Sequence, residues 1–228
     1  MEPEKLLKAL HTVGKLKTTM RHCYTDTGRK ESVAEHSWRV ALMAYWLEDE
    51  FPDVDMNKVI KMCLIHDLGE CFTGDIPCFK KTDSDEKTEE NLLFNWVATL
   101  PAPFDKEMRA LYDEMCERKT LEAQIYKALD NMEGVLAHNE SAIETWEPHE
   151  YELTKNYGID KTQFHPYIKR LREYMKKETE DKGYAQLKRD LREKSVRTVY
   201  VFYGEEIYLR EYYLNQLRKE LIPAGFEE

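Results

Sequence analysis

A histidine and a carboxylate stand side by side where an apolar helical run ends. The run reads "KMCLIHDLGECFTGDIP" over residues 61–77, with the pair His66 and Asp67 at its centre. Imidazole nitrogens and carboxylate oxygens together bind divalent cations of intermediate hardness. A set of two histidines and two carboxylates leaves positions for water and for a substrate oxygen. This stretch therefore predicts metal-assisted hydrolysis, provided that further ligands converge on it.

The further ligands must come from other helices. His36 lies on an earlier apolar stripe, and a later helix would have to supply one more acid. Adjacent residues of a regular helix point about 100° apart, so His66 and Asp67 share an ion only if it lies between them or the helix loosens there. Gly69 permits loosening. Glu70 follows Asp67 by three residues and His66 by four, which places it on the same face as a possible general acid or base.

Each of these residues also has an ordinary structural interpretation. A single histidine on an apolar face is usually a hydrogen-bonded core residue, and a carboxylate beside a glycine, such as Asp75, usually caps its own turn. Carboxylates in the middle of a helix, such as Asp130 and Glu133, most often lie at the surface. The combination favours a site, because two histidines and a neighbouring acid are costly to bury without a partner.

The elements that must position these residues are helical. Apolar residues and His36 recur with helical spacing over residues 36–47, and a second such stripe ends at His66. Asp55 is a suitable N-cap for this second helix. The "TGDIP" stretch at 73–77 predicts a loop. Further helices are expected at 83–100, 104–118, 120–139 and 160–195.

Composition narrows the class of protein. The chain has 228 residues, 42% of them hydrophobic, and a formal net charge of −10. This length supports one sizeable core, and the acidic field disfavours binding of nucleic acid. The sequence shows no run of about 18 apolar residues and no leader peptide, which predicts a cytoplasmic protein without a membrane partner. Five cysteines without CxxC spacing indicate neither a disulfide framework nor a cysteine zinc site.

The C-terminal stretch differs from the rest. "VYVFYG" predicts a strand, followed by a helix from about Glu205 to Lys219. A lone strand has no partner in a helical chain. The stretch resembles the opening strand and helix of the delta subunit of bacterial clamp loaders. We expect residues 181–228 to form a charged linker and a strand–helix tail of unknown role, either an amphipathic tail that packs on the body or a partner, or a fusion boundary.

Three motifs carry a family resemblance that covers most of the chain. They are "SVAEHSWRVA", "LIHDLGECFTGDIP" and "IYKALDNMEGVLAH". Together they resemble the HD-domain superfamily of metal-dependent phosphohydrolases, and within it the 5′-deoxynucleotidase group. The resemblance implies an all-α fold, an HD-domain helical bundle over residues 1–180. It implies four ligands for one divalent metal ion, namely His36, His66, Asp67 and Asp130.

The resemblance also implies roles around the ion. Glu70 would be the acid/base at the attacking water, and Asp75 would orient that water or the substrate sugar. "MRHCY" matches a phosphate- and sugar-binding Arg-Trp pair, with Arg21 retained and His22 in place of the tryptophan. The implied substrate is a nucleoside 5′-monophosphate, in particular a deoxynucleotide. The implied ion is Mn²⁺, Co²⁺ or another first-row ion, with Mg²⁺ possible, and the implied assembly is a homodimer.

Other functions share the same constellation. HD-type phosphodiesterases and nucleotide triphosphohydrolases use it on cyclic nucleotides and triphosphates. A non-catalytic binding module could use the ion as a structural cross-link. Glu70 and Asp75 argue against a structural role, because structural zinc sites favour four closed ligands, often with cysteine.

Overall fold

The chain forms two compact units, Met1–Lys177 and Glu178–Glu228. The computed structural model describes residues 1–195 and 207–221. The first unit is helical apart from one β-hairpin, so the expected all-α class is confirmed. That the activity resides in residues 1–180 stays a prediction, as does the tail's lack of a known role.

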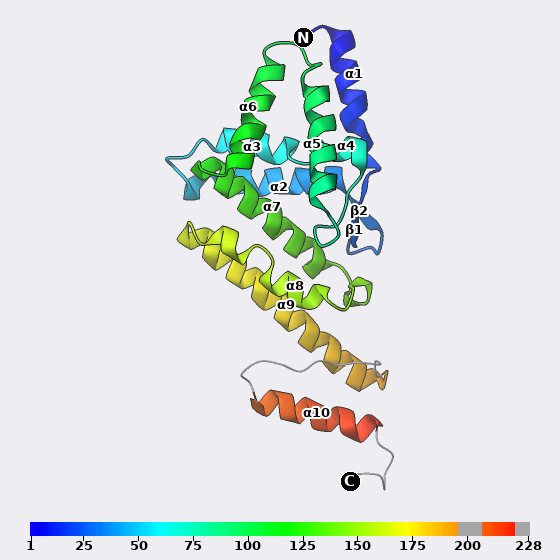
Figure 1. Cartoon of the computed structure of the whole chain (residues 1–228). Coiled ribbons are helices and arrows are strands. Elements are labelled where there is room, and N and C mark those ends of the chain that lie inside the picture. The colour runs from blue at the N-terminus through cyan, green and yellow to red at the C-terminus, as the bar shows by residue number, and fades with distance from the viewer. Residues whose placement is uncertain (196–206, 222–228) are drawn as a thin grey trace. The chain divides into compact units, whose positions relative to one another are not determined.

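The helices of the first unit cover the expected segments. They are α1 (Pro3–Val13), α2 (Val33–Trp46), α3 (Met56–Ile65), α4 (Glu70–Thr73), α5 (Asp83–Val97), α6 (Phe104–Glu117), α7 (Leu121–Glu140) and α8 (Glu150–Asn156), while α9 (Pro166–Glu193) crosses the unit boundary. Short 3₁₀ turns lie at Gly14–Lys17, Glu48–Glu50, Ile143–Thr145 and Ile159–Thr162. In Figure 1, α2 and α3 lie side by side and α7 packs against both.

Side-chain caps fix where the main helices begin. Ser32 forms a capping box with Glu35 at the start of α2. Asp55 accepts a hydrogen bond from the Lys58 amide at the start of α3, as predicted. Thr120 accepts one from the Ala123 amide at the start of α7. Each cap satisfies an amide that has no partner within its helix, an effect worth about 1 kcal/mol.

The core of the first unit lies where α2, α3 and α7 meet. Fully buried apolar side chains from these helices include Val40, Ala44, Val59, Met62, Ile125, Leu129 and Met132. Burying a large aliphatic side chain contributes about 1.5–3 kcal/mol, so this stripe fixes the three helices against one another. The same packing brings His36, the end of α3 and the middle of α7 together.

The hairpin was not predicted from the sequence. Strands β1 (Met20–Tyr24) and β2 (Lys30–Ser32) pair antiparallel, with Met20 opposite Ser32 and Tyr24 opposite Lys30. Strand β1 contacts α7, and β2 contacts α2. Such short strands carry a weak local signal, and their pairing is stabilised by the helices on which they pack.

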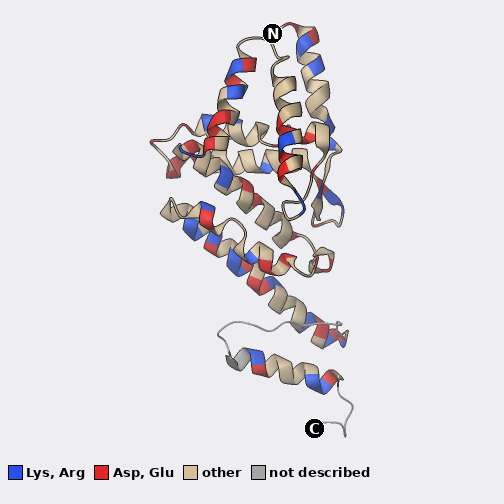
Figure 2. Ribbon diagram, in the orientation of Figure 1, with Lys and Arg blue, Asp and Glu red and all other residues tan. Residues whose placement is uncertain are grey.

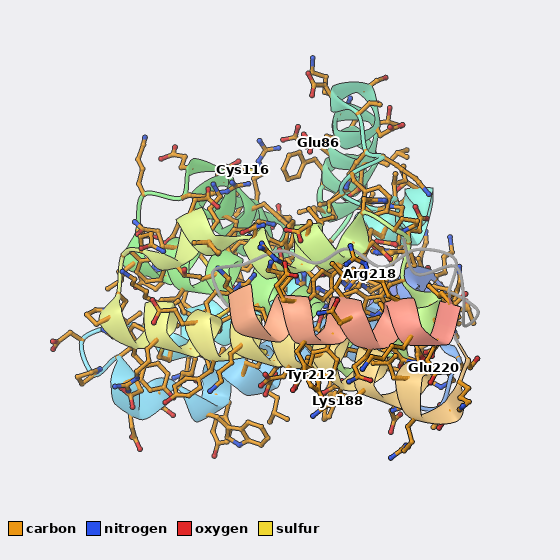
Figure 3. The ribbon with its side chains drawn as sticks, turned by 90° about the horizontal axis from the view of Figure 1, so that it is seen from below. Glu86, Cys116, Lys188, Tyr212, Arg218 and Glu220 are labelled. Atoms are coloured by element: carbon orange, nitrogen blue, oxygen red, sulfur yellow. The ribbon has the colours of Figure 1, made fainter. Side chains whose placement is uncertain are left out.

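The second unit contains the C-terminal part of α9 and α10 (Ile207–Leu221). Lys, Arg, Asp and Glu alternate along α9 (Figure 2). Within this unit Leu187 and Leu217 are buried, and Tyr212, Arg218 and Glu220 extend from α10 (Figure 3). Helix α10 corresponds to the helix expected near Glu205–Lys219. The expected "VYVFYG" strand lies outside the described residues, and the clamp-loader resemblance stays a prediction.

Candidate active site

Four side chains from three parts of the chain, α2, the end of α3 and α7, come close together. His36 Nε2 on α2 lies 3.1 Å from His66 Nε2, 3.5 Å from Asp67 Oδ2 and 3.2 Å from Asp130 Oδ1. His66 Nε2 lies 3.2 Å from the Asp67 oxygen and 3.4 Å from the Asp130 oxygen. Ligands about 2.1 Å from a common ion are separated by about 3.0 Å in an octahedron and about 3.4 Å in a tetrahedron. The Nε2 atoms of both histidines therefore lie at coordination-shell spacing from each other, from one Asp67 oxygen and from one Asp130 oxygen.

The chain geometry that brings His66 and Asp67 together is a break between two helices. Helix α3 ends at Ile65, and the Leu68 amide bonds to the Ile65 carbonyl at 3.1 Å in a tight turn. The Tyr112 hydroxyl donates to the same carbonyl at 2.5 Å. The helix therefore loosens, as expected, which lets two successive side chains reach one point.

The second nitrogen of each imidazole shows which atom carries the proton. His36 directs Nδ1 to the Glu133 carboxylate, and His66 donates from Nδ1 to the Cys63 carbonyl at 2.8 Å. Both acceptors lack a proton of their own, so each neutral ring presents a lone pair on Nε2. Two such lone pairs facing each other at 3.1 Å repel unless a cation lies between them.

The charges of this cluster also fit a divalent cation. Two neutral imidazoles and two carboxylates sum to −2. Burial lowers the pKa of His66, but the carboxylates of Asp67 and Asp130 outweigh it and raise that pKa well above its ordinary value. Burial raises the pKa of Asp67, but the His66 ring outweighs it and lowers that pKa to about 2. The cluster therefore attracts positive charge, either protons or a metal ion.

Lys127 orients one of the carboxylates. Its Nζ lies 2.6 Å from Asp130 Oδ2, one turn away on α7. Asp130 therefore presents Oδ1 to the histidines and keeps Oδ2 on the ammonium group. The sequence gives no signal that singles out Lys127, since an i, i+3 ion pair is common on helix surfaces.

The expectation that Glu133 lies at the surface is wrong. Its side chain is 0% exposed, and it accepts hydrogen bonds from Arg21 Nη1 at 2.9 Å and Arg39 Nε at 2.8 Å, beside its contact with His36. Burial raises the pKa of Glu133, but the His36 ring and the two guanidinium groups hold it well below its usual range. The available sequence signal was its position four residues after the buried Leu129, on the same face.

Glu70 and Asp75 lie beside the four converging residues. Glu70 is 7% exposed, and neither its Oε2 nor Asp75 Oδ2 has a hydrogen-bond partner within the described ranges. Burial, followed by the nearby charges of Asp67 and Asp75, raises the pKa of Glu70 to about 10. Burial also raises the pKa of Asp75. Two buried polar atoms without protein partners are suited to water or substrate.

The two predicted substrate-binding residues contact different neighbours. Arg21 Nη1 bonds to Glu31 at 2.8 Å and to Glu133 at 2.9 Å, next to the His36 contact. His22, the following residue of β1, lines a cavity of about 330 Å³ together with Asp75. Both residues lie in the irregular part of the β1–β2 pairing, between Met20 and Tyr24. The roles given to all eight predicted site residues stay predictions.

No helix in residues 1–195 or 207–221 is both long and apolar enough to cross a membrane. The cytoplasmic location, the homodimer and the lack of nucleic-acid partners stay predictions. All five cysteines are free thiols in the structure.

Curated proteins with similar sequences include 5′-deoxynucleotidase HDDC2 from Homo sapiens, which is 32% identical over 139 residues, 59% of this chain and 67% of the relative. The 5′-deoxynucleotidase HDDC2 from Dictyostelium discoideum is 35% identical over 133 residues, 54% of this chain and 70% of the relative. Among solved structures, a predicted metal-dependent phosphohydrolase from Magnetospirillum magnetotacticum is similar, with a TM-score of 0.68 and 28% identity. The match covers 79% of this chain and 96% of that one.

A family model described as "HD domain" matches residues 13–172. The matched segment contains His36, the His66 and Asp67 pair, and Asp130, the residues that carried the resemblance in the sequence. With more than half of its length matched, the chain belongs to the HD domain family.

Proposed function

We propose that this chain is a metal-dependent phosphohydrolase that removes phosphate from nucleoside 5′-monophosphates, deoxynucleotides in particular. The observation that carries the proposal is that the His36 and His66 Nε2 atoms lie 3.1 Å apart, and that each lies 3.2–3.5 Å from one oxygen of Asp67 and one of Asp130. The similarity to proteins named 5′-deoxynucleotidases supports the substrate class.

The four converging residues would hold one divalent ion. Mn²⁺, Co²⁺ or another first-row ion suits a set that is half imidazole, whereas Mg²⁺ prefers oxygen ligands and remains a weaker candidate. When bound, such an ion polarises a phosphoryl oxygen and lowers the pKa of water.

The protein's own residues would bind the phosphate and move the protons. The Arg21 guanidinium, anchored by Glu31 and Glu133, would grip phosphate oxygens from its remaining N–H groups. Glu70 would exchange a proton at its unpartnered carboxyl oxygen with the water that attacks phosphorus. Attack breaks the bond between phosphorus and the 5′ oxygen, and the leaving alkoxide takes the proton that the water has given up to Glu70. Asp75 would accept a hydrogen bond from that water or from the sugar.

Phosphate release by purified chain tests the proposal. The protein is stripped of metal, reloaded separately with Mn²⁺, Co²⁺, Zn²⁺ and Mg²⁺, and assayed on deoxynucleoside and ribonucleoside monophosphates. We expect metal-dependent release of inorganic phosphate and a loss of at least about a thousandfold in Asp67→Asn, since a ligand charge is removed. Asp113→Asn, the same change at a half-exposed position on α6, is the matched control.

Product analysis separates the alternatives. Tripolyphosphate from a deoxynucleoside triphosphate would indicate a triphosphohydrolase, and a monophosphate from a cyclic nucleotide would indicate a phosphodiesterase. No turnover with any ion, in protein that binds metal, would favour the non-catalytic module and contradict the proposal.

A further inference from the structure

A second cluster of metal-ligating side chains lies apart from the four residues described above. It contains His22 from β1, His138 from α7 and Glu150 from α8. His22 Nε2 lies 2.9 Å from Glu150 Oε1, and His138 Nε2 lies 3.3 Å from the same oxygen. One ligand atom from each residue lies within 4.8 Å of the other two. The cluster shares no residue with the first.

The hydrogen bonds of His138 leave a lone pair aimed at a carboxylate. Its Nδ1 lies 2.9 Å from the Gly134 carbonyl oxygen, which accepts hydrogen bonds and cannot donate. Nδ1 therefore carries the proton, and in the neutral ring Nε2 has none. A bare nitrogen 3.3 Å from a carboxylate oxygen is repelled unless a cation compensates. The cation is either a second proton on the ring or a metal ion, as at His66.

Glu150 is held so that one oxygen remains for this role. The residue is 3% exposed, and its Oε2 accepts a hydrogen bond from the Glu147 amide at 2.6 Å. Oε1 faces both imidazoles. Burial raises the pKa of Glu150, but the neighbouring His138 and His22 rings outweigh burial and keep that pKa well below its usual range. A buried, ionised carboxylate requires compensating positive charge.

Aromatic rings fix the orientation of both histidines. The Trp146 ring meets that of His138 edge to face at a centroid distance of 5.3 Å, and the Phe79 ring meets that of His22 at 5.5 Å. The Trp146 indole N–H donates to Ser141 Oγ at 2.9 Å, which fixes the indole in turn. His138, whose Nδ1 is occupied by the Gly134 carbonyl, therefore has the fixed orientation that is typical of metal-ligating histidines.

The cluster opens into a cavity large enough for an ion and a small ligand. All three residues line the cavity of about 330 Å³ that also contains Asp75 and Lys80. An ion held here would have three protein ligands and an open side toward the cavity. Two histidines and one carboxylate form the ligand set of many catalytic zinc and non-haem iron sites.

We propose that His22, His138 and Glu150 bind a second divalent cation of the first transition row, with its open position facing this cavity. The proposal does not depend on the hydrolase activity, because it rests on the contacts of these three side chains alone. A nitrogen-rich set selects Zn²⁺, Co²⁺ or Mn²⁺ over Mg²⁺ and Ca²⁺.

Metal stoichiometry tests this proposal. The metal-stripped full chain is titrated with Co²⁺, and binding is followed by calorimetry and by visible absorption. We expect two equivalents for the wild type and one for Glu150→Gln, which retains the acceptor for the Glu147 amide but loses the charge. Glu147→Gln removes a charge from the same cavity wall at a half-exposed position and should still bind two. Asp67→Asn should lose the other equivalent, and the double variant with Glu150→Gln should lose both.

The number of bound Co²⁺ equivalents can be measured whether or not the protein has phosphatase activity. A single wild-type equivalent that Asp67→Asn abolishes, or two equivalents that persist in both Glu150→Gln and His138→Ala, would overturn the second site and leave a proton on His138 as the compensating cation. His138→Ala does not touch the Glu147 contact, so it serves if Glu150→Gln fails to fold. If Asp67→Asn binds as many equivalents as the wild type while Glu150→Gln loses one, the result would contradict the proposed hydrolase site and not this one.

Discussion

His36 and Glu133 form a buried pair in which the imidazole Nδ1 faces the carboxylate, with the two side chains 1% and 0% exposed. The pair joins α2 to α7 across 97 residues of sequence. Because Nδ1 donates to Glu133, the His36 Nε2 lone pair is directed at His66, Asp67 and Asp130. One carboxylate thereby determines the tautomer, the ring orientation and the basicity of the nitrogen that faces the cluster.

Replacing Glu133 should weaken metal binding without removing a ligand. In Glu133→Gln the neutral amide cannot compensate the positive charges of Arg21 and Arg39, and His36 loses the carboxylate that orients its ring. We expect a loss of about 10–100-fold in metal affinity, measured by calorimetry, together with a lower melting temperature. Glu140→Gln, which also contacts Arg39 but is half exposed, is the control and should change neither quantity. Equal affinity in the wild type and Glu133→Gln would contradict the orienting role.

Lys127 should act in the same way on Asp130. Lys127→Met keeps the aliphatic stem but removes the ammonium group 2.6 Å from Asp130 Oδ2, so the carboxylate is free to rotate. We expect about tenfold weaker metal binding and a higher metal concentration for half-maximal phosphatase activity. Lys119→Met, at a position whose side chain is 78% exposed, tests the effect of losing one positive charge. Similar results for both variants would show a general charge effect only.

Arg21 should be sensitive to geometry as well as to charge. Arg21→Lys keeps the positive charge but cannot hold Glu31 and Glu133 while also offering two parallel N–H groups to phosphate. Losing a charge-assisted hydrogen bond costs about 1.5–3 kcal/mol, so kcat/KM should fall about 10–100-fold. Arg29→Lys, an exposed pair with Glu35, should leave kcat/KM unchanged. The values of kcat/KM are measured by steady-state kinetics with a deoxynucleoside monophosphate as substrate.

Glu70 should make the metal-free protein less stable at high pH. Its pKa is raised from an ordinary value of 4.5 to about 10, so the folded chain holds a proton that the unfolded chain releases. This contribution to stability is complete below pH 4.5 and is lost as the pH rises toward about 10. The melting temperature of stripped protein should therefore fall between pH 5 and pH 9, and fall less in Glu70→Gln.

The pKa values of His36 and His66 are also raised in the folded chain, so their contribution to stability is likewise lost as the pH rises. The difference in melting temperature between wild type and Glu70→Gln therefore isolates the contribution of Glu70. Glu86→Gln, an exposed position on α5 labelled in Figure 3, should follow the wild-type profile. Parallel profiles for all three proteins would show that Glu70 ionises normally in the folded chain.

Gly158 should be intolerant of a side chain. Its φ is +68°, and a Cβ there would lie 2.7 Å from Asn131 Cβ on α7. Strain and overpacking should make Gly158→Ala less stable by about 1–3 kcal/mol, measured by urea unfolding. A Cβ added at Gly14 has no atom within 4 Å, so Gly14→Ala should leave the free energy of unfolding unchanged or slightly increased. A neutral Gly158→Ala would mean that the turn relaxes away from α7.

The sequence by itself determined the elements and the ligand types. Apolar spacing predicted α2 and α3, and an acidic first turn with a proline stop predicted α5, because such signals and caps such as Asp55 act within a few residues. The adjacency of His66 and Asp67, with Gly69 behind them, predicted a loosened helix end. The resemblance then supplied Asp130, whose approach to His36 depends on contacts that spacing cannot give.

Only the tertiary structure decided how these residues are supported. Glu133 and Lys127 were indistinguishable from surface charges until α2, β1 and α7 packed together, and the His22, His138 and Glu150 cluster joins three elements. The β1–β2 hairpin likewise exists because helices cover it. Local propensity acts over one or two turns, whereas the compensation of a buried charge depends on partners a hundred residues away. Such partners are determined by the packing of the whole core.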